Sequence, residues 1–280
     1  MKKLKTFARI IIVTAISLLL SITVFYPYIV DHVLAAEQGQ DGKVTGDQGS
    51  AIDPEALAIL KKATDYLTGL PQFRLKGYKE VDAVQESGQK LQFFSSYDVH
   101  LKRPNRLFVS RTDDDGIMRR FWYDGKTATM YDEGEKVFGQ IQVPETIDEM
   151  LDYLETVLES PPPLADILYN DLSFLAERAL SGVYIDISFI QNIACDHLAF
   201  RGESVDWQMW IDRGEKPLIR KIVITYKELP GEPQLSARLV EWDTQPEISD
   251  TLFQFSIPEG ARRIPIVRSQ RRDSNEGGAQ

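Results

Sequence analysis

Cys195 and His197 are the residues of this sequence that most resemble a metal-binding pair. They lie two positions apart, so on a β-strand both side chains would point to the same side of the sheet and could share an ion. Two ligands do not make a metal site, however. We therefore interpret the pair as a buried free thiol beside a structural or exposed histidine, and we predict no bound metal.

The acidic stretch Asp113–Gly116 and the serines provide no clearer chemistry. The stretch has the oxygen ligands that calcium prefers, but it lacks the spaced ligands and the closing glutamate of the known calcium-binding loop. We predict a hairpin turn there instead. No serine lies in a G-x-S-x-G context, and no pair among the 42 acidic residues stands out as the two carboxylates of a glycosidase. We expect no catalytic residue and no cofactor, and hence a protein that is not an enzyme.

Large apolar side chains are the remaining candidates. The stretch Phe121–Asp132 is typical of a hairpin around Asp124-Gly125, because both central residues of such a turn need φ > 0. Three consecutive rings, Phe121 to Tyr123, place bulk on both faces of the sheet. One face can pack on a core, and the other needs a ligand or a partner. The residues predicted to line a hydrophobic ligand cavity are Phe94, Tyr97, Met118, Trp122, Leu151, Leu154, Trp207 and Met209, with Trp122 foremost.

Ordinary core beneath helices is the alternative for each of these residues, since apolar side chains in strands are usually buried packing. A register slip of one residue would also exchange Phe93 for Phe94 at the ligand. The sequence leaves both points open.

Charge and cysteine content exclude several classes of partner and site. The formal net charge of −10 argues against nucleic acid, because phosphate binding needs a basic surface. The single cysteine excludes an intrachain disulfide and a zinc site built on several thiolates. The expected ligand is therefore hydrophobic or a protein.

Residues 1–36 are predicted to be a signal peptide or an N-terminal membrane anchor. Basic residues precede an apolar run from Ile10 to Tyr28, and small residues follow it near Ala35. The run is long for a signal core, so retention in the inner membrane stays open. We expect a periplasmic protein with a flexible linker at 37–52, one domain at 53–265 and a disordered basic tail at 266–280.

The elements that must position the candidate residues are mostly strands. Asp53-Pro54 begins an amphipathic helix that ends near Gly69. Strand patterns with short, turn-like breaks cover 72–143 and 183–243, which indicates an antiparallel meander, and 252–255 is expected to close the sheet. Two helices, at 146–159 and about 164–180, interrupt the strands and are joined at Pro161–Pro163.

The order of these elements, together with four local motifs, resembles the outer-membrane lipoprotein carrier superfamily, the LolA/LolB-like fold. The motifs are Arg103-Pro104-Asn105-Arg106-Leu107, Trp122-Tyr123-Asp124-Gly125-Lys126, Trp210 to Lys221 and Ile248 to Phe255. The resemblance covers about residues 53–265. It is closer to a branch of predicted periplasmic proteins of unassigned function than to the carriers themselves.

This resemblance implies an α+β fold with a curved antiparallel β-sheet, an unclosed half-barrel, whose concave face is covered by helices. It implies a hydrophobic ligand, such as an acyl chain or a lipoprotein, held between the sheet and a helical lid around Pro161–Pro163. In a relative that regulates envelope stress the same fold acts as a sensor. The alternative function is therefore a protein-interaction module without an open cavity, with an envelope protein as its partner. Contact with the membrane would be transient or through the N-terminal segment.

Overall fold

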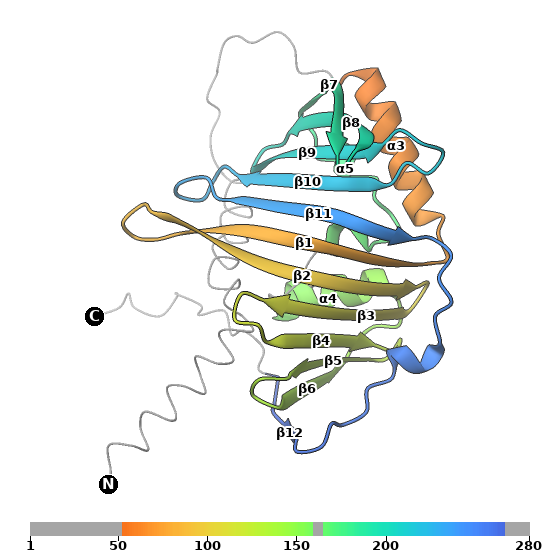
Figure 1. Cartoon of the computed structure of the whole chain (residues 1–280), viewed down its shortest axis with the longest axis vertical. Helices are drawn as coiled ribbons and strands as arrows, with labels where there is room; N and C mark the ends of the chain where they lie inside the picture. Colours follow the sequence, from red (N-terminus) through yellow and green to blue (C-terminus); the bar gives the residue numbers. More distant parts are fainter. Residues whose placement is uncertain (1–51, 159–164, 267–280) are drawn as a thin grey trace, which may run out of the picture.

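The computed structural model describes residues 52–158 and 165–266, and one curved β-sheet dominates it (Figure 1). The first six strands are β1 (Gln72–Val84), β2 (Lys90–Lys102), β3 (Arg106–Asp113), β4 (Met118–Tyr123), β5 (Thr127–Asp132) and β6 (Val137–Gln142). Each pairs antiparallel with the next one along the chain. They form the first meander, as the short turn-like breaks in the sequence predict.

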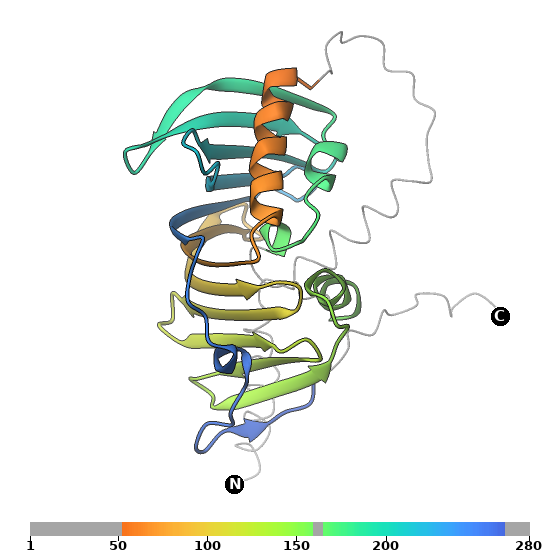
Figure 2. The ribbon, with the colours of Figure 1, turned by 90° about the vertical axis from the view of Figure 1, so that its right-hand side faces the viewer.

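The later strands form a second meander. They are β7 (Ser181–Ile190), β8 (Ile193–Arg201), β9 (Val205–Asp212), β10 (Ile219–Tyr226) and β11 (Gln234–Asp243). β11 pairs with β1, and the short β12 (Arg262–Arg263) adds parallel to β6. The result is one sheet in the order β12-β6-β5-β4-β3-β2-β1-β11-β10-β9-β8-β7, with β12 and β7 at its edges. The sheet curves without closing (Figure 2), which confirms the predicted half-barrel.

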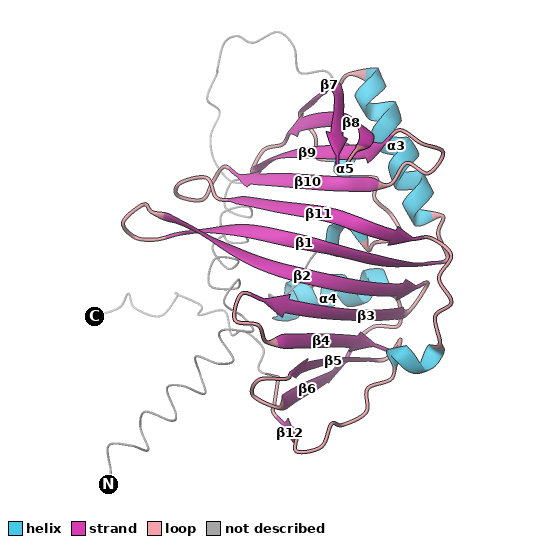
Figure 3. Ribbon diagram, in the orientation of Figure 1, coloured by secondary structure: helices cyan, strands magenta, loops and turns pink. Residues whose placement is uncertain are grey.

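Helices lie on the concave face of the sheet (Figures 2 and 3). α3 (Pro54–Thr68) begins after Asp53, whose carboxylate accepts a hydrogen bond from Glu55 N (2.9 Å), and it packs over β7 to β9. α4 (Ile147–Leu158) lies over the first meander. One half of its predicted capping box is present, because Glu149 N donates to Thr146 Oγ1 (3.3 Å), while the Glu149 carboxylate accepts from the Thr146 hydroxyl (2.8 Å).

The second inserted helix is much shorter than predicted for 164–180. The described residues 165–180 contain only a 3₁₀ turn, η2 (Ala165–Ile167), and a single-turn helix, α5 (Phe174–Glu177). Between them, Asn170 N donates to a carboxylate oxygen of Asp148 (2.9 Å) instead of to a carbonyl four residues earlier. Such a bond competes with a continuous helix. The expected joint at Pro161–Pro163 lies outside the described residues.

The prediction that 252–255 closes the sheet is wrong. Residues 250–253 form a 3₁₀ turn, η3 (Asp250–Phe253), because the Ser249 hydroxyl accepts a hydrogen bond from Thr251 N (3.4 Å) and caps it. The chain then runs to the far edge of the sheet, where β12 lies beside β6 (Figure 1). We refer to 249–258 as the C-terminal segment.

The hairpin at Asp124-Gly125 forms, but its loop is longer than a two-residue turn. Strand pairing ends at Tyr123 and Ala128. The Asp124 carboxylate accepts a hydrogen bond from Thr127 N (2.8 Å), and Gly125 takes a φ of +88°. The aspartate therefore shapes the loop through its side chain, while only the glycine uses a positive φ.

The predicted signal peptide or anchor at 1–36 and the linker and tail next to the domain lie almost wholly outside the described residues. In 52–158 and 165–266, no helix has the length and apolar character needed to cross a membrane. The described chain starts at Ile52, which forms a parallel bridge with Gly182 at the start of β7.

Candidate functional site

Most of the concave face of the sheet is apolar. Side chains alternate between the two faces of a sheet, so residues that pair across strands share a face. One row across β1 to β4 consists of Phe73, Leu101, Leu107 and Tyr123, and all four are fully buried. The helix residues buried in the same core cluster are Ala56, Leu60, Ala63, Leu67, Ile147, Met150, Leu151 and Leu154. Helices α3 and α4 therefore cover this face with apolar side chains.

The structure brings together five of the eight predicted ligand-binding residues and separates the other three. The five are all buried in the core between the concave face and the helices: Tyr97, Leu151, Leu154, Trp207 and Met209. The other three point to the opposite, convex face of the sheet: Phe94, Met118 and Trp122. The strand register decides this division, because each of the three lies an odd number of positions from a concave residue of its own strand.

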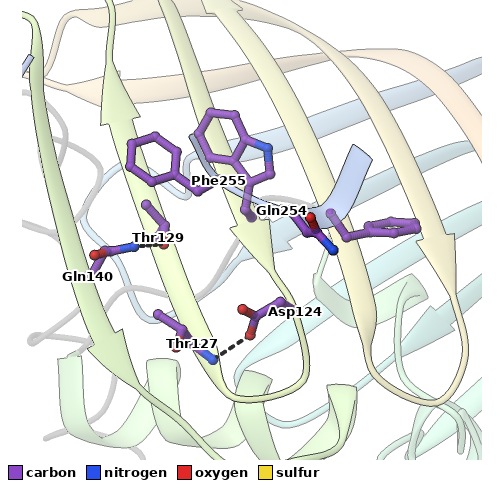
Figure 4. Close-up of a pocket in the computed structure, with 8 residues that line it drawn as sticks. Asp124, Thr127, Thr129, Gln140, Gln254 and Phe255 are labelled. Carbon is purple, nitrogen blue, oxygen red and sulfur yellow. Dashed lines mark hydrogen bonds between the residues drawn. The ribbon is translucent and has the colours of Figure 1, made fainter. Parts of the chain in front are cut away.

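Trp122 packs beneath the C-terminal segment on the convex face. Its ring centroid lies 5.5 Å from that of Phe108 and 5.0 Å from that of Phe255. A pocket of about 130 Å³ opens beside it (Figure 4). Most of the lining is polar: Asp124, Thr127, Thr129, Gln140 and Gln254, with Trp122, Phe253 and Phe255. The ring placed foremost by sequence analysis thus faces this segment and not the helices.

Arg103 fastens the helical insertion to the sheet. It lies in the turn between β2 and β3. Among the described residues, its guanidinium donates hydrogen bonds to neutral acceptors only. These acceptors are the carbonyl oxygens of Leu70 (3.2 Å), Leu168 (3.1 Å) and Tyr169 (3.2 Å) and the side-chain oxygen of Asn170. One side chain therefore joins the sheet, the end of α3 and the segment between η2 and α5.

Asp148 extends the same contact to α4. Its carboxylate accepts hydrogen bonds from N (2.9 Å) and Nδ2 (2.8 Å) of Asn170. Burial lowers the pKa of Arg103, and the charge of Asp148 raises it. Two further hydrogen bonds tie the start of α4 to the sheet, from Tyr123 Oη to Pro144 O (2.7 Å) and from Ile147 N to Pro104 O (2.9 Å). The insertion is thus held by a few polar bonds around an apolar contact.

A charged network occupies one end of the concave face. Arg119 bonds to the carboxylates of Asp113 (2.6 Å), Asp115 (2.9 Å) and Asp132 (3.0 Å), and Arg111 also binds Asp113 (2.7 Å). Burial lowers the pKa of Arg119, but the hydrogen bond with Asp115 and the three carboxylate charges outweigh it and raise the pKa. The acidic stretch is therefore a turn, as predicted, whose carboxylates bind arginines.

Cys195 and His197 have packing and hydrogen-bonding roles. The thiol is buried, and burial raises its pKa. The His197 ring stacks on Trp210 with centroids 4.1 Å apart, and its Nε2 lies 3.0 Å from Gln208 Oε1. In the part of the chain that the structure describes, no group of three or more His, Cys, Asp or Glu side chains could hold a metal ion.

Two cations of the concave side, Arg103 and Lys79, were not predicted from the sequence. Lys79 lies on β1 at the same alternate positions as Phe73 and Leu75, so the period of two could have placed it on the concave face. Arg103 gave no comparable signal, because its bonded partners lie 33 to 67 positions away in the sequence.

Three solved structures have similar folds. The lipoprotein LppX of Mycobacterium tuberculosis is 14% identical with a TM-score of 0.45, over 70% of this chain and 98% of LppX. A LolA superfamily protein of Nitrosomonas europaea is 11% identical with a TM-score of 0.38, over 71% and 97%. In the MucA/MucB complex of Pseudomonas aeruginosa, the matched chain is 15% identical with a TM-score of 0.36, over 72% of this chain and 61% of the other.

The sequence itself matches a family model. No curated protein matches the chain. The model described as "Predicted periplasmic protein (DUF2092)" matches residues 56–267, which is most of the sequence and nearly all of the domain. The resemblance to a branch of predicted periplasmic proteins is thereby confirmed. The chain belongs to the DUF2092 family of predicted periplasmic proteins.

Proposed function

We propose that this protein binds an acyl chain of a lipid or lipoprotein, without catalysis, between the concave face and its helical covers. One observation carries the proposal. A large apolar sheet face is covered by helical segments that are separate in the sequence and fastened by few polar bonds. Ligand sites of this kind are mostly apolar. The side chains proposed to contact the chain are Tyr97, Trp207 and Met209 of the sheet and Leu151 and Leu154 of α4.

Removal of methylene groups from water would drive the binding. Each buried methylene contributes about 0.8 kcal/mol, so ten of them contribute roughly 8 kcal/mol. Ordering of the ligand and movement of the covers subtract from this value. Because Leu151 and Leu154 are buried against the sheet, the acyl chain has to replace their contacts when it enters.

The insertion from α4 to α5 is the proposed lid. It lies between β6 and β7 in the chain, so both of its ends are anchored in the sheet. Lifting breaks the hydrogen bonds of Arg103 with Leu168, Tyr169 and Asn170. Water can take over these bonds once the segment is exposed, so breaking them costs far less than the sum of the bonds, and the exposure of apolar side chains is the main cost of opening.

Native mass spectrometry of the protein recovered from a periplasmic preparation tests the proposal directly. We expect mass increments that correspond to acyl lipids, and after their removal we expect a fluorescent fatty acid to bind with a stoichiometry of one. A protein that carries no lipid and binds no fatty acid would contradict the proposed function.

Leu154→Gln locates the binding face. The variant places an amide in the proposed contact, and we expect roughly tenfold weaker binding of the fatty acid, from the loss of about 1.5 kcal/mol of apolar burial. Leu57→Gln is the matched control, because Leu57 is an exposed leucine of α3. Equal affinities of the two variants would place the ligand away from α4.

A second candidate function is the docking of a protein strand on β7. β7 ends the sheet, and among the described residues its outer side is hydrogen-bonded only near its start, by the bridge of Ile52 with Gly182 and by Asp53, which bonds to Gly182 O (2.8 Å) and Tyr184 N (3.4 Å). Four apolar side chains of β7 are 42–70% exposed: Val183, Ile185, Ile187 and Phe189. An exposed apolar edge of this kind accepts an added strand. We take the occupant to be an extended apolar segment of another envelope protein.

A photo-crosslinker at position 189 tests this second function. In producing cells we expect an adduct with another protein that Ile187→Lys abolishes and that Ile257→Lys, at an exposed site outside β7, leaves intact. An adduct between two copies of this chain, or no adduct, would contradict the docking of a different protein.

A further inference from the structure

Polar side chains replace apolar ones where β1, β2 and β3 approach the charged network of the concave face. The register pairs Lys79 with Ser95 and Ser95 with Asp113 in one row. In the neighbouring row, Tyr97 pairs with Arg111. These five residues lie on the same concave face as the proposed acyl contacts Trp207 and Met209, and none of them has a part in the proposed lid.

Lys79 is a buried cation without an anionic partner among the described residues. Its side chain is 4% exposed, and its Nζ lies 5.6 Å from the centroid of the Tyr97 ring. The nearest carboxylate in the register, Asp113, is already bound by Ser95 Oγ (2.6 Å), by Arg111 (2.7 Å) and by Arg119 (2.6 Å). A buried ammonium group is costly unless it is paired. The ammonium group of Lys79 is therefore available to bind an anion.

The hydroxyl of Tyr97 is a second unused donor. It is buried and has no partner within hydrogen-bond distance. Burial raises the pKa of Tyr97 to about 12, and the nearby Arg111 and Ser95 only partly oppose this shift. The hydroxyl therefore keeps its proton at neutral pH and can donate it to an acceptor. A buried polar group without a partner calls for an explanation such as a bound ion or water. An ammonium group on β1 and a hydroxyl on the adjacent strand β2 thus share one face and the same unmet requirement, which is an acceptor.

We propose that Lys79 and the hydroxyl of Tyr97 bind the acidic group of an acyl ligand, a carboxylate or a phosphate. This inference rests on the proposed function and adds the charge of the ligand to it. An anion there would meet the positive charges of Lys79 and Arg111 and would accept the proton of Tyr97 Oη. Charge-assisted bonds of this kind are the strong ones in a site of low polarity.

A row of buried apolar side chains leads away from this anion site along the concave face. From Lys79 the register runs across β11, β10, β9 and β8 through Ala237, Ile222, Met209 and Leu198, all of them buried. Four strand spacings correspond to about 19 Å. An acyl chain along this row would cross beneath the helices while its acidic group stays at Lys79.

Palmitate and 1-hexadecanol test the inference, because they share a chain length and differ in charge. Each is titrated against the protein loaded with the uncharged fluorophore N-phenyl-1-naphthylamine. We expect the unaltered protein to bind palmitate more tightly than hexadecanol. Lys79→Met is expected to weaken palmitate binding tenfold to a hundredfold and to change hexadecanol binding less than twofold, from about 1.5–3 kcal/mol for a bond to a charged group.

Lys76→Met is the matched control. Lys76 lies on the same strand but on the convex face, where its Nζ pairs with Glu241 (2.9 Å). We expect this variant to bind both ligands as the unaltered protein does. Should Lys79→Met fail to fold, Tyr97→Phe removes only the unpartnered hydroxyl, and we expect it to weaken palmitate binding threefold to tenfold without loss of stability.

Each outcome decides between the two proposals. If both ligands bind and neither Lys79→Met nor Tyr97→Phe affects palmitate more than hexadecanol, the anion site is wrong while acyl binding stands. If neither ligand binds, the proposed function fails and the anion site of an acyl ligand fails with it. If inorganic phosphate alone raises the melting temperature in a Lys79-dependent way while palmitate and hexadecanol bind equally, the site takes a free anion, which also overturns the inference.

Discussion

The two faces of β4 carry neighbouring aromatic residues under different covers. Tyr123 on the concave face is fully buried, and its hydroxyl donates to Pro144 O at the start of the proposed lid. Trp122 on the convex face packs against Phe255 of the C-terminal segment. The concave cover is a folded insertion fastened by polar bonds around Arg103, whereas the convex cover is a short segment held by ring contacts and by one exposed ion pair, Lys102 with Asp250 (2.6 Å). Hydrogen bonds of the concave cover can be replaced by bonds to water, so we expect this cover to open more easily than the convex cover, whose ring contacts water cannot replace.

The largest difference between the faces is expected from truncation of these two rings. Tyr123→Ala removes a fully buried ring and leaves the Pro144 carbonyl without its donor, so we expect a loss of about 4 kcal/mol in the free energy of unfolding. Trp122→Ala, at a half-buried position, should cost about 2 kcal/mol and leave acyl binding unchanged. Urea unfolding of both variants measures the difference, and equal losses would remove the distinction between the faces.

Arg103→Met tests the polar fastening of the concave cover. The substitution leaves the acceptors at 70, 168, 169 and 170 without their donor, and we expect a loss of about 3 kcal/mol of stability. Hydrogen exchange should quicken in α4 more than in the strands, because the lid opens first. Arg106→Met is the control, since among the described residues the guanidinium of Arg106 donates hydrogen bonds to Asn105, in its own turn, and to no other residue. Uniform quickening across the sheet would contradict a separate lid.

Lys79 gives the concave face a pH dependence. Burial, together with the charge of Arg111, lowers its pKa from 10.5 to about 8, and the charge of Asp113 opposes this shift. The unfolded chain therefore holds this proton more tightly than the folded protein, and stability rises as the pH passes from 8 towards 10.5. Between pH 7.5 and 9.5 we expect a gain of about 2 kcal/mol relative to Lys79→Met. Unfolding curves that shift in parallel for both proteins would show that Lys79 is not desolvated.

The smallest effect is expected from an exposed pair on the convex face. The rings of Tyr78 and Phe94 lie 5.6 Å apart on β1 and β2, and both are partly exposed. A double-mutant cycle with Tyr78→Ser and Phe94→Ser should give a coupling energy of about 0.5–1 kcal/mol, with no change in acyl binding. A change in acyl binding would mean that the convex face also contacts the ligand.

The fold was largely predictable from the sequence because its signals are local. The helix after Asp53 has an aspartate cap and a following proline, and the strands are separated by turns rich in Gly, Asp and Asn. The broken helix at 164–180 was missed because the competing bond from Asn170 to Asp148 spans 22 positions. A period of 3.6 residues cannot reveal such a partner.

The face of each aromatic residue was much harder to predict. Strand alternation requires that Trp122 and Tyr123 point to opposite faces of the sheet. Which of the two faces is concave depends on where the helices and the C-terminal segment pack, and the strand pattern does not contain this information. Phe255, which covers Trp122, lies more than a hundred positions away and was expected in the sheet. The five concave residues of the predicted set and the three convex ones therefore look alike in the sequence.

The pairing of β1 with β11 has a consequence for how the chain is made. It joins residues 74 and 243, which are roughly 170 positions apart. One edge of β1 therefore has no neighbour until almost the whole domain has been synthesised, and its backbone groups are open to wrong association during that time. Because such long-range pairings form slowly, the sheet can be completed only after the last strands of the chain emerge. A ribosome-bound or partly exported chain that stops before residue 234 would lack the strand that joins its two halves.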